Sequence, residues 1–307
     1  MIIIDFSQIA YAALHAVAVQ GKVDESFLRH LVLNSILHVQ RKHSHKYGKE
    51  IVLACDNHHC WRRDCFPAYK YERRQGKTKD EFDWDSIHAS LNHIQQEIKE
   101  HFRYIVVNVY GAEGDDVIAV LANHAYFSCV DTEPNEFGGL VLDSERSQQA
   151  VHYPTLIVSS DKDYGQLGHI ADQYDPKKKV FITSTDPDAS LRQLILKGDV
   201  ADGVPNILSD DDVFMAKNKK QKSITAKKML EWNAMSDQLL RDSDAVINRN
   251  WPRNNRLVNL RNGTPIGIVS DIKKQYFEQQ DKKANGLMDY FFKNHLHKLM
   301  ADIQEFQ

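Results

Sequence analysis

The sequence is poor in the features that mark secreted and membrane-bound proteins. Only four cysteines occur in 307 residues. Their number and spacing do not suggest a disulfide framework, so we interpret them as reduced thiols. No apolar run approaches the roughly 20 residues that cross a bilayer, and no signal peptide is visible. We therefore expect a protein of the cytoplasm that makes no contact with membranes.

Nucleotide-binding and zinc-binding patterns are also missing. Neither GxGxxG nor GxxxxGKS/T occurs, which argues against nucleotide-driven chemistry. The stretch CDNHHCWRRDC contains cysteine and histidine, but its spacing fits no common zinc site. The charged residues therefore carry the functional argument.

Charge is nearly balanced over the whole chain but unevenly distributed along it. The formal net charge is −3, yet residues 61–79 contain seven Lys or Arg against two acids. Residues 217–228 contain six Lys and no acid. Basic stretches beside a separate group of acids are typical of a protein that holds a polyanion at its edges and metal ions in between. The alternative for each stretch is a solvated, charged surface segment.

Short apolar runs alternate with helical patterns in the first part of the chain. The runs predict strands at residues 2–4, 51–55, 103–110 and 155–160. Apolar residues at helical spacing predict helices over 27–39, 87–102 and 113–125. This alternation predicts an α/β fold with a central, mostly parallel sheet flanked by helices.

Residues further along predict a hairpin and then a change of structure. QYDPKKKVFIT, at 173–183, is typical of a hairpin or edge pair, and helical patterns dominate from about residue 189. We therefore expect an α/β core over 1–188 and a mostly helical domain over 189–307. Residues of about 127–153 lack a clear period and are expected to form a surface insertion.

Acidic residues follow closely after each predicted strand, and two more come after the helical pattern at 190–197. They are Asp5, Asp56, Glu113, Asp115, Asp116, Asp161, Asp163, Asp199 and Asp202. The carboxyl ends of parallel strands meet at one edge of a sheet, so these side chains are expected to lie together. One aspartate at a strand end is an ordinary turn residue, but repetition at every strand favours a metal site. Oxygen ligands without His or Cys suit Mg²⁺ or Mn²⁺.

These motifs together resemble the 5′-nuclease or flap endonuclease family, most closely its ribonuclease H members from T-even bacteriophages. The resembling stretches are IIIDFSQIA, IVLACDN, WRRD, AYKYERRQGK, AEGDDVIAVL, SSDKDYGQL and LKGDVADGV. Similarity continues through RLVNL to DYFFKNHLHKLMADIQEF. The resemblance implies a 5′-nuclease or PIN-like core, a basic helical arch over about 61–82, and a C-terminal helical domain that binds duplex DNA.

The resemblance also implies two Mg²⁺ ions, which Mn²⁺ could replace. The first would be held by Asp5, Asp56, Glu113 and Asp115. The second would be held by Asp161, Asp163 and one or both of Asp199 and Asp202, with Asp116 nearby. We expect catalytic roles for Lys70, Arg73, Asp115 and Asp116, with Lys70 and Arg73 at the scissile phosphate.

Nucleic-acid contacts are expected from both basic stretches. Tyr69 would stack on a base near the 5′ end. Single-stranded nucleic acid would be gathered by Arg62, Arg63, Arg74 and Lys77. Duplex contacts are expected from Lys217, Lys219, Lys220, Lys222, Lys227 and Lys228. Many family members carry a second glycine-rich turn after this GDxxD element, often with bound potassium. Here VPNILSDDD follows Gly203 instead, so we carry over no potassium site at 203–210.

The expected function is a Mg²⁺-dependent, structure-specific 5′-to-3′ nuclease that removes RNA primers and adjacent DNA during replication, in the host cytoplasm if the gene belongs to a phage. Its substrates would be branched or nicked duplex DNA and RNA–DNA hybrid with a 5′ end. A single-stranded DNA-binding protein is a further expected partner by analogy. Two alternatives stay open: a PIN-like ribonuclease of single-stranded RNA, and a DNA-junction binding protein without catalysis.

Overall fold

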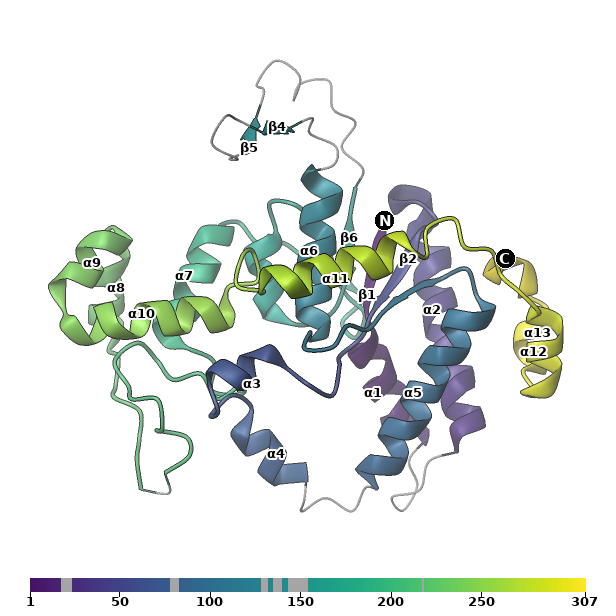
Figure 1. Cartoon of the computed structure of the whole chain (residues 1–307), viewed down its shortest axis with the longest axis horizontal. Helices are drawn as coiled ribbons and strands as arrows, with labels where there is room; N and C mark the ends of the chain where they lie inside the picture. Colours follow the sequence, from purple (N-terminus) through teal and green to yellow (C-terminus); the bar gives the residue numbers. More distant parts are fainter. Residues whose placement is uncertain (18–23, 78–82, 128–131, 135–139, 143–153, 217) are drawn as a thin grey trace.

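The computed structural model describes residues 1–17, 24–77, 83–127, 132–134, 140–142, 154–216 and 218–307. Its main sheet has six strands in the order β3-β2-β1-β6-β7-β8 (Figure 1). Their bounds are β1 Ile2–Asp5, β2 Ile51–Ala54, β3 Ile105–Val107, β6 Leu156–Val158, β7 Asp172–Asp175 and β8 Val180–Ile182. The first five are parallel and β8 pairs antiparallel with β7. The predicted parallel sheet and the hairpin at 173–183 are both confirmed.

Helices cover both faces of this sheet. The longer helices are α1 Phe6–Val17, α2 Glu25–Tyr47, α5 Trp84–His101, α6 Gly114–Phe127, α7 Pro187–Lys197, α10 Ala245–Val258 and α11 Ile266–Phe277. The shorter helices are α3 Trp61–Cys65, α4 Tyr71–Lys77, α8 Ala226–Asn233, α9 Asp237–Ser243, α12 Leu287–Lys293 and α13 His297–Met300, with single 3₁₀ turns η1 Lys162–Leu167 and η2 Ile303–Phe306. Within the described residues, no helix is long and apolar enough to span a membrane.

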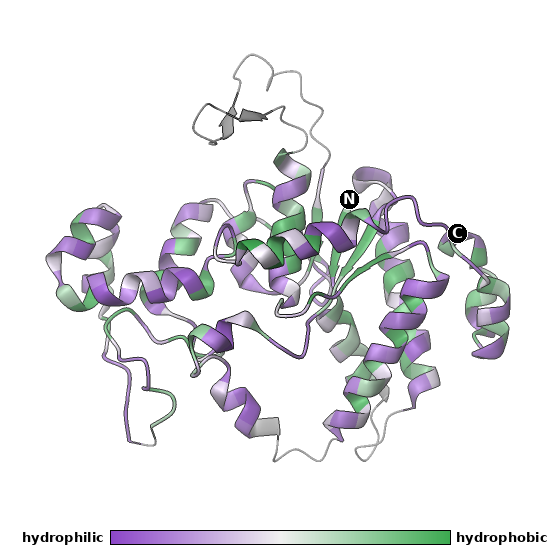
Figure 2. Cartoon of the chain, in the orientation of Figure 1, coloured by the Kyte–Doolittle hydropathy of each residue, from purple (hydrophilic) through white to green (hydrophobic). Residues whose placement is uncertain are grey.

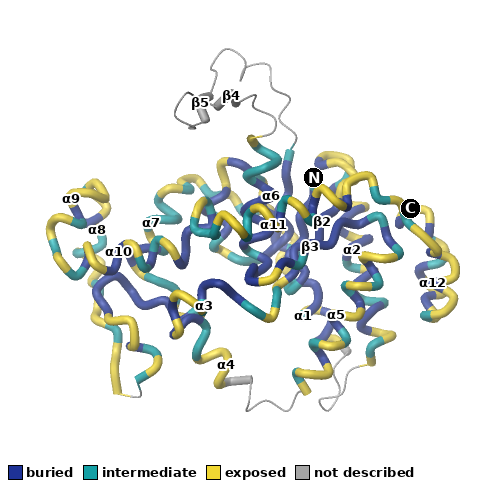
Figure 3. Tube along the Cα trace, viewed as in Figure 1, coloured by how far each residue is buried: buried dark blue, intermediate teal, exposed yellow. Residues whose placement is uncertain are grey.

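The strands are apolar on both sides because helices bury both faces. Ile2 and Ile4 join a core with α1, α2 and α5, whereas Ile3 joins a second core with α6 and α11. All three side chains are fully buried. Continuous apolar strands are the pattern of a two-sided parallel sheet, and Figures 2 and 3 show these strands as hydrophobic and buried. The carboxyl ends of β1, β2, β3 and β6 therefore come together at one edge.

The region predicted as a separate helical domain packs in two parts, one against the basic segment and one against the sheet. Residues from Leu191 to Val258 share a core with Cys60, Phe66 and Tyr69 of the basic segment. Residues from Leu260 onward return to the sheet instead, where the Gln279 side chain hydrogen-bonds both the N–H and the C=O of Val106 on β3. The expected single unit over 189–307 is therefore not what the packing shows.

The basic segment and the insertion are described in part. Helices α3 and α4 lie in the basic segment as expected, whereas residues 78–82 of the predicted arch fall outside the described residues. In the insertion, β4 Thr132–Pro134 pairs antiparallel with β5 Leu140–Leu142, a pair that the sequence analysis did not predict. The remaining residues of that insertion are outside the described part of the chain.

Candidate active site

The predicted acids lie at the carboxyl edge of the sheet because of how each strand ends. Asp5 is the last residue of β1, and Asp56 comes two residues after β2. Asp115 lies in the first turn of α6, where the helix dipole favours an acid. Asp161 follows β6 and caps η1, since its side chain accepts a hydrogen bond of 2.9 Å from the Asp163 N–H.

Neutral donors from the same edge orient these carboxylates. The Ser7 hydroxyl donates to Asp56 at 2.5 Å, and the Gly114 N–H donates to its other oxygen at 2.7 Å. The Ser159 hydroxyl donates to Asp5 at 3.0 Å, and the Tyr164 hydroxyl donates to Asp115. Two serines and a tyrosine that the sequence analysis did not select therefore help to fix the acids.

Burial and neighbouring negative charge raise the pKa of three of these acids. Burial, and then the charge of Asp56, raises the pKa of Asp5 to about 7. Burial, and then the charges of Asp161 and Asp199, raises the pKa of Asp163 to about 7. Burial also raises the pKa of Asp115 well above its ordinary value, although Lys70 opposes the shift. Like charges in a desolvated site produce this pattern, and it is typical of functional sites.

Lys70 brings the basic segment into the acidic site. Its Nζ lies 2.6 Å from Glu113 Oε1 and 3.6 Å from Asp202 Oδ2, and its N–H donates to the Asp202 carbonyl at 2.7 Å. Arg73 Nη2 lies 2.9 Å from Asp202 Oδ1. Burial by itself would raise the pKa of Glu113, but Lys70 and Arg62 outweigh it and lower that pKa to about 2. Glu113 is therefore ionised at neutral pH.

Tyr69 does not have the exposed ring that base stacking needs. Its side chain is buried, and its hydroxyl lies 2.9 Å from both Glu113 Oε2 and Asp202 Oδ2. The expected stacking role is therefore wrong for this arrangement, because the ring packs in the core shared with α7 and α10. The Tyr69 hydroxyl instead bridges the carboxylates of Glu113 and Asp202.

Arg62 and Asp116 form a buried ion pair behind the site. Both Arg62 Nη atoms lie 2.9 Å from Asp116 oxygens, and Nη1 also lies 3.0 Å from Glu113. Asp116 accepts further hydrogen bonds from the Trp61 indole and the Thr264 hydroxyl. The expected nucleic-acid contact for Arg62 is contradicted by its burial, since the guanidinium has no free surface. Asp116 accepts hydrogen bonds from Arg62, Trp61, Thr264 and the Glu113 N–H, and its catalytic role stays a prediction.

Where they are described, the other predicted nucleic-acid residues are exposed or half-buried. Arg63 and Arg74 donate to the carbonyls of His58 and Pro67. Lys219 is paired with Asp212, and Lys228 lies over the Trp232 ring. Exposed lysines of the second basic stretch are Lys219, Lys220, Lys222 and Lys227. Lys217 and the side chain of Lys77 fall outside the described residues.

The loop after Asp202 is organised by side chains that the sequence analysis missed. The Arg253 guanidinium donates to the carbonyls of Pro205, Asn206 and Ser209. Asn250 donates to the carbonyl oxygens of Ile207 and Ser209. These donors reach the loop from α10, about fifty residues away in the chain. Side-chain donors from α10 thus bind the carbonyls of Pro205, Asn206, Ile207 and Ser209.

The donor set fits a hard divalent cation by its chemistry. Every candidate ligand is a carboxylate oxygen, and Asp163 Oδ1 is buried without a hydrogen-bond partner. Within the described residues, however, no three Asp, Glu, His or Cys side chains already surround one point at metal-binding distance. Lys70, Tyr69, Ser7 and Tyr164 take carboxylate oxygens instead. Ion binding would therefore require side chains to exchange these partners.

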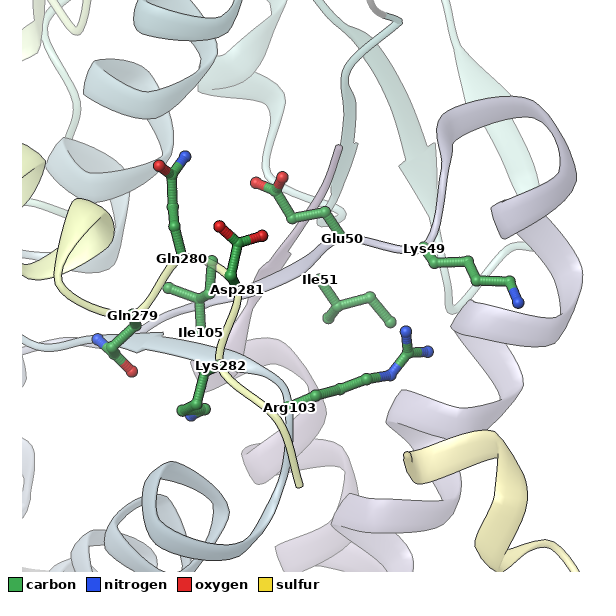
Figure 4. Close-up of a pocket in the computed structure, with 9 residues that line it drawn as sticks. All are labelled: Lys49, Glu50, Ile51, Arg103, Ile105, Gln279, Gln280, Asp281 and Lys282. Atoms are coloured by element: carbon green, nitrogen blue, oxygen red, sulfur yellow. The ribbon is translucent and has the colours of Figure 1, made fainter. Parts of the chain in front are cut away.

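A cavity at the opposite edge of the sheet is a separate feature. It has a volume of about 360 Å³ and is lined by Lys49, Glu50, Ile51, Arg103, Ile105, Gln279, Gln280, Asp281 and Lys282 (Figure 4). Ile51 and Ile105 begin β2 and β3, so this cavity lies at the amino ends of the strands, away from the carboxylates. Its charges are mixed in sign and define no ligand.

A parallel sheet with carboxylates along its carboxyl edge, contacted by a lysine from a basic segment, is an arrangement that suits nucleases acting on phosphodiesters. Residues 1–132 match the family described as 5′-3′ exonuclease, N-terminal resolvase-like domain. The chain is 31% identical over 319 residues to the ribonuclease H of Enterobacteria phage T4, covering 99% of this chain and 95% of that protein. The chain therefore belongs to the 5′-3′ exonuclease family.

Solved structures share the fold at lower identity. A bacteriophage T5 protein crystallised with metal ions matches with a TM-score of 0.62 and 13% identity, over 91% of this chain and 99% of that one. The T5 5′-exonuclease with bound zinc matches with a TM-score of 0.60 and 12% identity, over 91% and 98% of the two chains. The T5 flap endonuclease in a complex with DNA and metal ions matches at 0.53 and 11% identity, over 91% and 98%. These likenesses support the fold.

Proposed function

We propose that this chain is a divalent-metal-dependent 5′-to-3′ nuclease of 5′ flaps and primers, and that Mg²⁺ is its natural ion. The main support for the proposal is the contact of Lys70 with Glu113 beside carboxylates of Asp5 and Asp163, whose pKa values are raised by burial and then by neighbouring negative charge. Such a concentration of negative charge would repel a phosphodiester, which is itself an anion. Bound cations would neutralise the carboxylates and allow the phosphodiester to bind.

The carboxylates divide into two sets of ligands in this proposal. Asp5, Asp56, Glu113 and Asp115 would hold one ion. Asp161 and Asp163 would hold the second, with Asp199 and Asp202. Bound ions of this kind supply an activated water and neutralise the charge that develops on the phosphate. Tyr164 and Ser7 keep the carboxylates of Asp115 and Asp56 in place.

Lys70 and Arg73 are the residues proposed to hold the scissile phosphate. Both are paired with carboxylates in the structure, at 2.6 Å from Glu113 and 2.9 Å from Asp202. When ions take these oxygens, the ammonium and guanidinium are left next to the reacting group with their charges free. Fixed cations at that point stabilise a transition state that gains charge on the phosphate oxygens.

The remaining cations are proposed to gather the nucleic acid. Arg63 on α3 and Arg74 on α4 belong to the basic segment that also carries Lys70, and Lys219, Lys220, Lys222 and Lys227 are exposed in the second basic stretch. Because the chain as a whole carries a net charge of −3, binding should depend on these local patches and weaken steeply with salt. A single-stranded DNA-binding protein as a partner stays a prediction from family analogy.

The proposal is tested with a nicked duplex that carries a labelled 5′ RNA–DNA flap, compared with a labelled free single-stranded RNA. We expect Mg²⁺ to support release of short 5′ products from the duplex, EDTA to abolish it, and the free RNA to be cut little. Preferential cutting of the free RNA would instead indicate a PIN-like ribonuclease. Binding of the flap without any cutting would indicate a junction-binding protein.

A further inference from the structure

An exposed aromatic stack joins the loop between β2 and α3, which carries His59, to the turn between β3 and α6, which carries Tyr110. Tyr110 is 66% exposed. Its ring stacks on His59 with centroids 4.7 Å apart and planes inclined by 5°, and its edge meets His58 at 5.9 Å. Because His59 covers one face of a ring that is still largely exposed, the other face of Tyr110 is open to solvent.

The two loops that carry this stack are joined by hydrogen bonds. The N–H groups of Asn57 and Trp61 donate to the carbonyls of Ala112 and Gly111 at 3.1 and 2.9 Å. Gly111 has a φ of +85°, and a Cβ there would approach Ile268 to 3.2 Å, so the close packing of this turn requires glycine. The ring pair is thus held in place before any ligand arrives, which reduces the entropy lost on binding.

The stack is next to the acidic site in both loops. His59 follows Asp56 by three residues, and Tyr110 precedes Glu113 by three residues. The Arg63 guanidinium donates a hydrogen bond to the His58 carbonyl at 2.9 Å, which places a cation at the backbone of the loop that carries His59. A flat aromatic face with a neighbouring cation is the arrangement that holds single-stranded nucleic acid without reading its sequence.

We propose that Tyr110, backed by His59, is a stacking platform for an unpaired base of the strand whose phosphate enters the acidic site. The proposal rests on the nuclease function proposed above. It also supplies the stacking group that Tyr69 cannot provide, since Tyr69 is buried. A protein partner fits less well, because the open surface is one ring among polar residues, His58, Arg63 and Asp64, and not a broad apolar patch.

The test uses the full-length protein in EDTA, so that binding is measured without cutting. A 5′-flap duplex carries 2-aminopurine at one flap position at a time, and fluorescence reports stacking. We expect the wild type to quench one position, and Tyr110→Ala to lose that quenching and about tenfold in affinity. Tyr110→Phe and Tyr110→Trp should retain both. The control is Phe292→Ala on α12, which removes another exposed ring, 63% exposed and edge-on to His297.

The outcomes separate the platform from the nuclease function. If Tyr110→Ala keeps wild-type quenching and affinity while the wild type cuts the flap in Mg²⁺, the platform is overturned and the nuclease function stands. An equal loss in Phe292→Ala would also overturn it, because the effect would then not belong to this site. A wild type that neither binds nor cuts the flap would overturn both proposals.

Discussion

At the scale of single residues, Lys70 is the most informative side chain of the site. Its backbone has a φ of +53°, in the left-handed region that non-glycine residues rarely adopt. The contacts of its N–H with Asp202 and of its Nζ with Glu113 hold it there. Strained residues of this kind collect at functional sites. Lys70 thus places a positive charge where the carboxylates would otherwise repel one another.

Removing the charge of Lys70 should separate metal binding from catalysis. We expect Lys70→Met to bind Mn²⁺ about tenfold more tightly in the absence of nucleic acid, because a competing cation has gone. Hydrolysis of the flap substrate should fall by about 100-fold, because the phosphate loses its stabilising charge. Calorimetric titration and a cleavage assay measure the two effects. Lys46→Met, on α2, serves as a control, and weaker Mn²⁺ binding by Lys70→Met would contradict this account.

Asp163 should make the metal-free protein less stable as pH rises. Its pKa is about 7 in the folded chain, against an ordinary 3.8, so the folded state binds the proton more tightly. The resulting stabilisation is complete below about pH 4 and disappears as pH rises through 7. In EDTA, we expect the melting temperature of Asp163→Asn to fall less between pH 5 and 8 than that of the wild type.

Asp163→Asn should also keep the fold and lose nearly all Mg²⁺-dependent hydrolysis. Asp289→Asn, an exposed aspartate on α12, should change neither the pH slope nor the activity. Parallel dependence of the two melting temperatures on pH across this range would show that burial and neighbouring charge do not raise the pKa of Asp163 in the folded protein. Wild-type turnover in Asp163→Asn would remove it from the metal site.

At the scale of secondary-structure elements, the sequence predicts at which edge of the sheet a residue lies better than it predicts whether the side chain faces the core or the solvent. The acids could be assigned to one edge because parallel strands must end there, whatever the details of packing. Arg62 and Tyr69 lie in a stretch rich in charge, and such a stretch gives no periodic signal that one guanidinium and one phenol face inward. Arg253 was missed for another reason: its carbonyl partners lie more than forty residues away, so no local pattern contains them.

The buried ion pair should fix α3 to α6 and to the turn before α11. Arg62→Met leaves the buried Asp116 without its main partner and removes one of the two cations that pair with Glu113, and we expect the free energy of unfolding in urea to fall by about 3–5 kcal/mol. The double variant Arg62→Met, Asp116→Leu should recover part of that loss, since the unpaired buried charge is removed. A wild-type stability for Arg62→Met together with weaker salt dependence of DNA binding would restore Arg62 as a phosphate contact.

At the scale of the whole molecule, the C-terminal segment packs in the same hydrophobic core as the N-terminal strand and helices. The strands of the first half need cover on both faces, and the last forty residues provide part of it. Phe291 and Phe306 are fully buried beside Phe102 and Tyr104, in the core that includes α2 and α5. The helical content of this segment could be predicted from its sequence. Its return to the sheet could not, because an apolar helix face does not specify which core covers it.

This packing makes the last aromatic residue a test of the architecture. Phe306→Ala removes a ring that contacts Phe102, Tyr104 and Phe291, and we expect it to lower the free energy of unfolding by about 3–5 kcal/mol. Phe292→Ala, an exposed ring only fourteen positions earlier, should change it by less than about 0.5 kcal/mol. Urea unfolding followed by tryptophan fluorescence measures both. An equally small effect of the two variants would mean that the C-terminal segment is a separate appendage. A selective loss in Phe306→Ala means that the sheet carrying the carboxylates is stabilised by residues three hundred positions away from Asp5.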